Sequence, residues 1–187
     1  MFKKEYLIFI FLIVFQNNIF SQDKFDLEKL DNTIDLQNID YKLINLAVLF
    51  YTNNHRKKYK KSVLKYNNTL EKSALLHSLE MNKYNFFDHI NRKNKKFKNL
   101  EDRAKYVGYS NYILLAENLY YGFVDLRKLP TYRELSIEIT QAFITSRSHN
   151  FNLLDNKIKE LGCYLVFKEN QKNGFLNYYF TQSFGTK

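Results

Sequence analysis

Residues 114–122 read Leu-Leu-Ala-Glu-Asn-Leu-Tyr-Tyr-Gly and place one acid, Glu117, in the middle of an apolar run. A lone carboxylate is costly to bury, so Glu117 must either turn to solvent or meet cations, hydrogen-bond donors or a metal. Two of the four histidines, His89 and His149, lie at comparable distances along the chain on either side. We therefore expect these three residues to meet in one cleft. The run itself suits a strand or a short buried helical turn, and periodicity alone leaves both open.

The N-terminus has the pattern of a secretory signal peptide. Two lysines, Lys3 and Lys4, precede an apolar run over residues 7–15, which is too short for a bilayer because a spanning helix needs about 20 residues. We expect residues 1–21 to be removed by cleavage near Ser21 and the protein to be exported, either to the periplasm or out of the cell. No later run predicts a transmembrane segment in the mature chain.

The remaining chain has the length of one ordinary domain. It holds 5 Gly and 1 Pro and shows no repeat, so we assign residues 22–39 to an N-terminal arm or short helix and residues 40–187 to the domain. The single cysteine, Cys163, excludes an internal disulfide, and its place on an expected strand indicates a small buried hydrophobic side chain. Packing must then stabilise the fold, and the whole sequence, residues 1–21 included, holds 17 Phe and 15 Tyr. We expect a monomer.

The chain is basic, with a formal charge of +10 at pH 7. Its lysines are spread along the sequence without a nucleic-acid-binding motif, so specific binding to nucleic acid is not expected. We expect the densest basic runs, residues 56–61 and 92–98, to be solvated loops. His55 lies in the same basic stretch, which we expect to be exposed, and is given no role. Weak attraction to acidic surfaces of the cell envelope stays open.

The apolar spacing predicts helices that frame a sheet. The expected helices cover residues 40–55, 69–84, 100–107 and 130–149. Gly108 follows the third of them, as is typical of a helix C-terminus. Two β-rich runs, residues 160–169 and 175–184, are joined by a short connection that contains glycine, which is typical of a hairpin. Together these elements indicate a layered α/β domain.

In this order the segments resemble a CAP-superfamily domain, the fold of cysteine-rich secretory proteins, antigen 5 and plant pathogenesis-related proteins. The segments that carry the resemblance are residues 74–81, 86–89, 103–109, 117–118, 143–149 with Asn152 and Leu154, 161–162 and 179–185. The chain is most similar to the short, disulfide-free bacterial branch, over about residues 40–187. The resemblance implies an α-β-α sandwich in which helices flank a central, mainly antiparallel sheet.

The resemblance also implies a surface cleft lined by two histidines and one or two glutamates, with a divalent cation bound in some members. The matching residues are His89, Glu117 of the Glu-Asn pair, and His149. The family's other glutamate would fall near Ser146, where this chain has no acid. Glu117 is therefore expected to be the only carboxylate in the cleft, which disfavours catalysis by two carboxylates.

The three residue types leave two arrangements open. Two imidazoles and a carboxylate suit zinc or a similar divalent cation, while a carboxylate that accepts hydrogen bonds from two imidazoles satisfies all three groups without metal. Each residue also has a purely structural alternative: Glu117 could cap backbone amides, His89 could be a plain loop residue, and His149 could interact with carbonyls at a helix end. Four further residues are expected around the cleft: His77, Asn118, Tyr179 and Gln182. The alternative is packing within its helix for His77, structural hydrogen bonding for Asn118, and core packing or edge bonding for Tyr179 and Gln182.

Three functions of different classes follow. The first is an exported binding module whose cleft holds a small ligand, a lipid or a divalent cation, as the resemblance implies because CAP members include sterol and lipid binders. The second is a hydrolase that uses Ser146, His149 and Glu117, or a histidine-bound metal that activates water, although no nucleophile elbow surrounds the serine. The third is a basic protein that adheres to anionic envelope polymers by charge. We favour the binding module.

Overall fold

The computed structural model describes residues 26–168 and 173–187, so the predicted signal peptide and its cleavage site lie outside the described residues. The helices and strands are α1 (Tyr41–Lys58), β1 (Lys65–Tyr66), α2 (Asn68–Tyr84), α3 (Leu100–Tyr106), β2 (Leu114–Asp125), α4 (Tyr132–Thr145), α5 (Arg147–Leu154), β3 (Glu160–Phe167) and β4 (Phe175–Thr186). Two short 3-10 helices, Glu28–Asp31 and Lys95–Phe97, complete the described elements.

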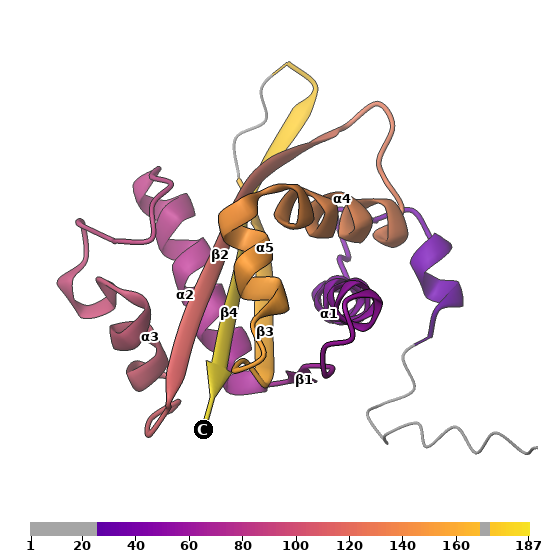
Figure 1. Ribbon diagram of the computed structural model, residues 1–187. Helices are drawn as coiled ribbons and strands as arrows, with labels where there is room; N and C mark the ends of the chain where they lie inside the picture. Colours follow the sequence, from indigo (N-terminus) through magenta and orange to yellow (C-terminus); the bar gives the residue numbers. More distant parts are fainter. Residues whose placement is uncertain (1–25, 169–172) are drawn as a thin grey trace, which may run out of the picture.

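The four strands form one sheet in the order β1-β3-β4-β2, so β2 is an edge strand. Strand β4 pairs antiparallel with both β3 and β2, and β1 pairs parallel with β3. Helices α2 and α3 cover one face of the sheet, and α1, α4 and α5 lie on the other (Figure 1). The expected α-β-α sandwich with a mainly antiparallel sheet is therefore confirmed, and the run around Glu117 is a strand.

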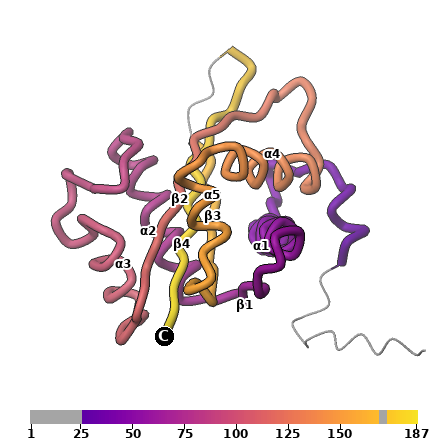
Figure 2. Tube along the Cα trace, viewed as in Figure 1, coloured from indigo at the N-terminus to yellow at the C-terminus, as the bar shows by residue number. Residues whose placement is uncertain are grey.

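Both faces of β2 are packed, which explains its nearly continuous apolar sequence. Val124 belongs to the large core shared with α1 and α4, and Ala116 and Tyr120 pack against it. Leu119 belongs to a smaller cluster on the α2 side. Side chains alternate along a strand, so Glu117, an odd-numbered residue like Leu119, points toward α2 and α3. Helices α1 and α4, which are distant in sequence, lie side by side on the opposite face (Figure 2).

Side-chain caps set where the helices that carry the site begin. Asn67 accepts hydrogen bonds from the first amides of α2, and Asn99 with Asp102 forms a capping box at the start of α3. Helix α2 then lies so close to β3 that a Cβ on Gly162 would stand 2.0 Å from the backbone nitrogen of Glu71. A glycine is required at this crossing, because any side chain would push the helix off the sheet.

The structure corrects two expectations about helices. The helix expected over residues 130–149 is broken at Ser146, whose ψ of 120° separates α4 from α5. The first helix extends to Lys58 and so includes the start of the basic run 56–61. That run is not wholly solvated, because Arg56, inside the helix, is fully buried. Its guanidinium donates to the carbonyl oxygens of Leu153, at 2.6 Å, and Asp155, at 3.1 Å, at the end of α5. These carbonyl acceptors make a buried arginine tolerable.

His55 is also buried, contrary to its expected place in an exposed stretch. Its Nε2 lies 2.8 Å from Oδ1 of Asn150, so the imidazole joins α1 to α5.

The described part of the expected N-terminal arm, residues 26–39, contains one short 3-10 helix, and Thr33 forms an isolated β-bridge with Thr131. None of the helices in residues 26–168 and 173–187 has the length and apolar character needed to cross a membrane.

Candidate functional site

Glu117 lies at the centre of a buried network, with 8% of its surface exposed. Arg103 of α3 donates from Nη2 to Oε2 at 2.6 Å, and His89 donates from Nδ1 to Oε1 at 3.0 Å. A carboxylate only accepts, so the proton between His89 and Glu117 is assigned to Nδ1. The acid in the apolar run therefore meets a fixed cation and a hydrogen-bond donor, as its burial requires.

His77 supports this network from α2. It is fully buried, its Nε2 donates to the carbonyl oxygen of Asp88 at 3.1 Å, and the same nitrogen is 3.7 Å from Oε1 of Glu117. Because Asp88 directly precedes His89, this bond holds the loop that presents the second imidazole. Glu80 fixes the same loop further on, where its Oε2 accepts from the side-chain amides of Asn91 and Asn94 at 2.7 and 2.9 Å.

The surroundings set distinct charges on these groups. Burial alone would raise the pKa of the Glu117 carboxyl, but the hydrogen bond from His89 and the charge of Arg103 outweigh it, so this pKa lies below 4.5. Burial lowers the pKa of His77 to about 4, which keeps that imidazole neutral at pH 7. The hydrogen bond to Glu117 raises the pKa of His89 above 6.5. Burial, followed by repulsion from His89, lowers the pKa of His149.

His149 lies on the opposite face of β2 from Glu117 and makes no hydrogen bond to it. It belongs to α5, its ring packs edge-on against Phe143 with centroids 5.2 Å apart, and its backbone carbonyl accepts from the Asn118 amide at 3.2 Å. Burial, and after it repulsion from His89, lowers the pKa of His149, so the two imidazoles are close enough to interact electrostatically. Of the three predicted site residues, His89 and Glu117 are therefore hydrogen-bonded to each other, and His149 is separate from them.

Asn118 and Gln182 act together as an anchor between the sheet and α5. The Asn118 amide donates to Oε1 of Gln182 at 3.2 Å, and Asn152 of α5 donates to Oδ1 of Asn118 at 2.9 Å and to the backbone oxygen of Glu117 at 3.3 Å. These bonds hold α5, and with it His149, against β2. Tyr179 is only 3% exposed and belongs to the small core cluster on the α2 side.

Within residues 26–168 and 173–187, the three residues of the hydrolase hypothesis, Ser146, His149 and Glu117, are not joined to one another by hydrogen bonds. The Ser146 hydroxyl lies 3.3 Å from the hydroxyl of Ser148, at the break between α4 and α5, and makes no hydrogen bond to His149. Glu117 is engaged with His89 and Arg103 instead. A nucleophile needs its base, and the base its orienting group, within hydrogen-bond reach, and this arrangement supplies neither link.

The same geometry disfavours a metal at this site. Among residues 26–168 and 173–187 no group of three or more His, Cys, Asp or Glu side chains is placed to hold a metal ion. Both carboxylate oxygens of Glu117 are already bonded, and the Arg103 guanidinium beside them would repel a divalent cation. The residues present therefore do not fit zinc or a similar ion.

Arg103 is the main participant that the sequence analysis left without a role. It is fully buried next to Ala104 in a helix of 7 residues. A signal was available, because a buried carboxylate needs a cation and Arg103 is the nearest arginine before Glu117 in the chain. Glu80, which fixes the loop after His89, carried no comparable signal.

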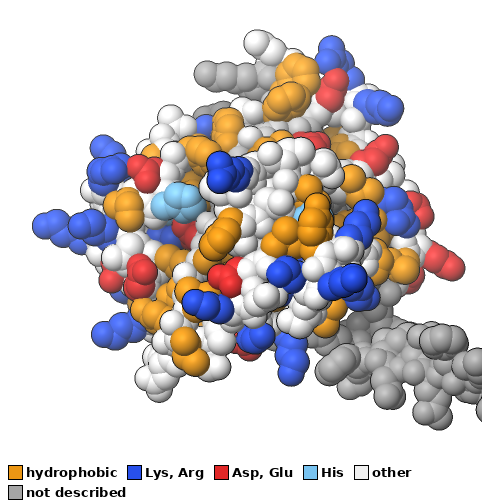
Figure 3. Space-filling model, viewed as in Figure 1, with side chains coloured by type: hydrophobic (Ala, Val, Ile, Leu, Met, Phe, Trp, Pro, Cys, Tyr) orange, Lys and Arg blue, Asp and Glu red, His pale blue; other side chains and the backbone are white. Residues whose placement is uncertain are grey.

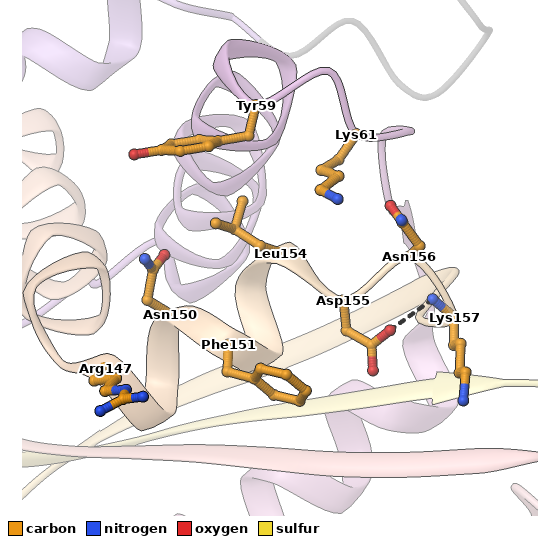
Figure 4. A pocket seen from close by; sticks show the side chains of 9 residues that line it. All are labelled: Tyr59, Lys61, Arg147, Asn150, Phe151, Leu154, Asp155, Asn156 and Lys157. Atoms are coloured by element: carbon orange, nitrogen blue, oxygen red, sulfur yellow. Dashed lines mark hydrogen bonds between the residues drawn. The ribbon is translucent and has the colours of Figure 1, made fainter.

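A separate hollow of about 650 Å³ lies beyond α5 and contains none of the three predicted site residues. Figure 4 shows its lining, from Tyr59 and Lys61 at the end of α1 and from side chains within residues 147–157. The bond drawn there joins the Asp155 carboxylate to the Lys157 amide. We place the candidate site at Glu117, because within residues 26–168 and 173–187 it is there that buried charged groups converge on a partly exposed imidazole.

With the fold and this geometry established, comparison with known proteins assigns the family. The model of the CAP, cysteine-rich secretory protein, family matches residues 49–184, which is more than half of the chain. The chain therefore belongs to this family, and the sequence resemblance is confirmed. No curated protein matches it significantly.

Several solved structures share the fold. An extracellular protein with an SCP domain from Bacillus anthracis aligns with a TM-score of 0.59 and 20% identity, over 79% of this chain and 41% of that protein. An outer surface protein from Borrelia burgdorferi aligns with a TM-score of 0.62 and 18% identity, over 84% of this chain and 98% of that protein. The chain thus spans less than half of the Bacillus anthracis protein and nearly all of the Borrelia protein.

Proposed function

We propose that this chain is an exported CAP-domain protein that binds, without transforming it, the anionic group of a ligand between His89 and His149. The observation that carries the proposal is the full engagement of Glu117 by Arg103 and His89. A carboxylate with a depressed pKa and both oxygens bonded is a poor proton acceptor, and it has no free position for a metal. Its effect is to orient the His89 ring and to favour the positively charged form of that ring.

The two histidines of the proposed site would offer a matching pair of donors. The His89 side chain is 52% exposed, and its Nδ1 is committed to Glu117, which leaves the Nε2 proton available to a ligand. His149 is half-buried and neutral, so it can donate a second hydrogen bond. Carboxylates and phosphates are the groups that a charged and a neutral imidazole hold best together, through charge-assisted hydrogen bonds. Small molecules and lipid headgroups both carry such groups.

Export is supported by the N-terminal pattern and by the nature of the structural neighbours. The Bacillus anthracis protein is described as extracellular, and the Borrelia burgdorferi protein as an outer surface protein.

The distribution of basic residues bears on the alternative of adhesion by charge. Lysine and arginine side chains are spread around the face seen in Figure 3, on which a histidine is also exposed. That distribution favours a local site over adhesion through one large basic patch.

Acetate is the simplest probe of the proposed function. We expect acetate to shift the ring resonances of His89 and His149 in 1H-13C spectra of the purified chain, while the buried rings of His55 and His77 stay unchanged. Affinity should fall as the pH rises through the pKa of His89, because the imidazolium loses its charge. Chloride at equal ionic strength is the control. The proposal fails if acetate moves neither ring, or if a His89→Gln variant binds acetate as the unmodified chain does.

A further inference from the structure

The free edge of β2 next to this cleft indicates what kind of molecule carries the anionic group. We propose that the ligand is an extended polypeptide whose main chain pairs with the outer edge of β2, antiparallel to it, and whose C-terminal carboxylate lies between His89 and His149. This inference rests on the function proposed above, since it names the ligand of the same site.

Register shows which main-chain groups of β2 are free. The pairing of β2 with β4 runs without a bulge from Leu114↔Thr186 to Asp125↔Phe175. Just beyond it, the Leu126 amide donates to Gly174 at 2.8 Å, so even-numbered residues of β2 direct their amides and carbonyls to β4. Main-chain groups alternate sides along a strand, so the odd-numbered residues direct theirs outward.

One outward carbonyl already shows how a partner would bind. The backbone oxygen of Glu117 accepts from the side-chain amide of Asn152 at 3.3 Å, in the manner of a neighbouring peptide group. Beyond it, Leu119, Tyr121 and Phe123 are the next outward residues, and β2 has no strand beside them in residues 26–168 and 173–187. Unpaired amides and carbonyls in a row are a template for strand addition.

Aromatic side chains flank the same part of the edge. Tyr121 is 40% exposed, Phe123 57% and Phe87 51%, and the Phe87 and Tyr121 rings lie 6.1 Å apart. Phe87 is two residues from His89, so the same loop contributes one of these rings and the charged imidazole of the proposed site. Exposed rings beside free backbone groups suit the alternate side chains of an added strand, which supply specificity in this binding mode.

The edge also lacks the usual protection against pairing. Soluble proteins blunt exposed edges with lysine, proline or a bulge, and residues 114–125 contain none of these.

The spacing along β2 sets the length of the peptide. The distance from Phe123 to Glu117 is six strand positions, about 20 Å at ~3.3 Å per residue. A peptide of about six residues would therefore reach from the aromatic side chains to the two imidazoles. Its carboxylate end would meet the positive charge of His89.

The direct test is a titration of the purified chain with the peptide acetyl-Thr-Val-Thr-Val-Thr-Val bearing a free carboxylate. We expect the backbone amides of Leu119, Tyr121 and Phe123 to shift in 1H-15N spectra and to exchange more slowly with deuterium. The even-numbered amides, already bonded to β4, should keep their exchange rates. Affinity should exceed that of acetate by at least about tenfold, and amidation of the carboxylate should reduce it by about the same factor.

A matched pair of variants separates backbone pairing from ring contacts. Tyr121→Pro removes one outward amide, a position where proline is tolerated on an edge strand, and Tyr121→Ala removes the ring but keeps the amide. We expect both variants to keep the acetate response at His89. The proline variant should lose peptide binding, and the alanine variant should bind the peptide more weakly than the unmodified chain but more tightly than the proline variant. If the proline variant does not fold, the same peptide N-methylated at alternate residues tests the point on the unmodified chain, and it should not bind.

The outcomes distinguish this inference from the proposed function. If acetate shifts His89 but the peptide binds no tighter and leaves the Tyr121 and Phe123 amides unchanged, the function stands and the inference is wrong. If neither probe reaches His89, both are wrong. Equal affinity of the acid and amide peptides would overturn the position of the carboxylate. Concentration-dependent self-association in sedimentation velocity, with protection of the same amides, would assign the edge to a second copy and overturn the peptide.

Discussion

Replacing Arg103 by methionine tests the buried ion pair on which the site depends. The guanidinium is fully buried and 2.6 Å from a carboxylate that is itself 8% exposed. Methionine fills much of the same volume, so the principal change is the loss of the cation. Removing one partner of a buried pair typically costs about 3–5 kcal/mol, because the remaining charge is left uncompensated. His89 still donates to Glu117 in this variant, which places the expected loss toward the lower end.

The assay is urea unfolding at pH 7, and the comparison variants are Arg92→Met, Glu117→Gln and the double variant Arg103→Met/Glu117→Gln. Arg92→Met removes an ion pair with Asp88 that is largely exposed, and should cost less than about 1 kcal/mol. The double variant Arg103→Met/Glu117→Gln also removes the stranded charge, and should be more stable than Arg103→Met alone. A loss for Arg103→Met no larger than that for Arg92→Met would refute the account of the ion pair. So would a double variant whose loss equals the sum of the two single losses.

Three further predictions concern acid, an anchor and metal. The free energy of unfolding should fall as the pH is lowered from 6.5 to 4, because the pKa of His77 is depressed in the folded chain and the unfolded chain therefore takes up a proton that the folded chain does not. This loss is roughly 3 kcal/mol. His77→Gln should make the free energy of unfolding, measured in urea, depend less on pH in that range. Asn152→Ala leaves two buried oxygens without a donor and should cost about 1–3 kcal/mol in urea unfolding, whereas Asn156→Ala, on the surface, should cost little. Zinc should not raise the melting temperature, and a rise that His89→Gln abolished would contradict the geometry of the site.

Much of this fold follows from local patterns that the sequence displays. The periodic helices, the glycine after α3 and the antiparallel β3–β4 pair were all predicted from spacing and turn residues. The need of Glu117 for partners followed from its apolar neighbours, and the positions of His89 and His149 along the chain, together with the family resemblance, suggested those two histidines. These features depend on interactions between residues close in sequence, or on a motif that spans the domain.

The parts that escaped prediction depend on contacts between distant residues. Arg56 lies in a basic run typical of a solvated loop, yet it is buried, because its guanidinium donates to backbone carbonyls about 100 positions further along the chain. The break at Ser146 has no glycine or proline to signal it; it lies where α5 turns onto β2, held by Asn118 and Asn152. Arg103 likewise finds Glu117 only after α3 packs beside β2. Sequence periodicity contains no information on such partners.

The most direct test of the central claim is the pKa of the His89 ring, measured by 1H-13C NMR in the unmodified chain and in Glu117→Gln. The account predicts that His89 titrates above 6.5 in the unmodified chain, that its pKa falls in the variant because the carboxylate charge is lost, and that acetate binding weakens with it. Asp88→Asn, at the neighbouring residue, is the matched control and should change the His89 pKa far less, since its contribution is the smallest. A His89 pKa that is ordinary in the unmodified chain and unchanged by Glu117→Gln would contradict the account.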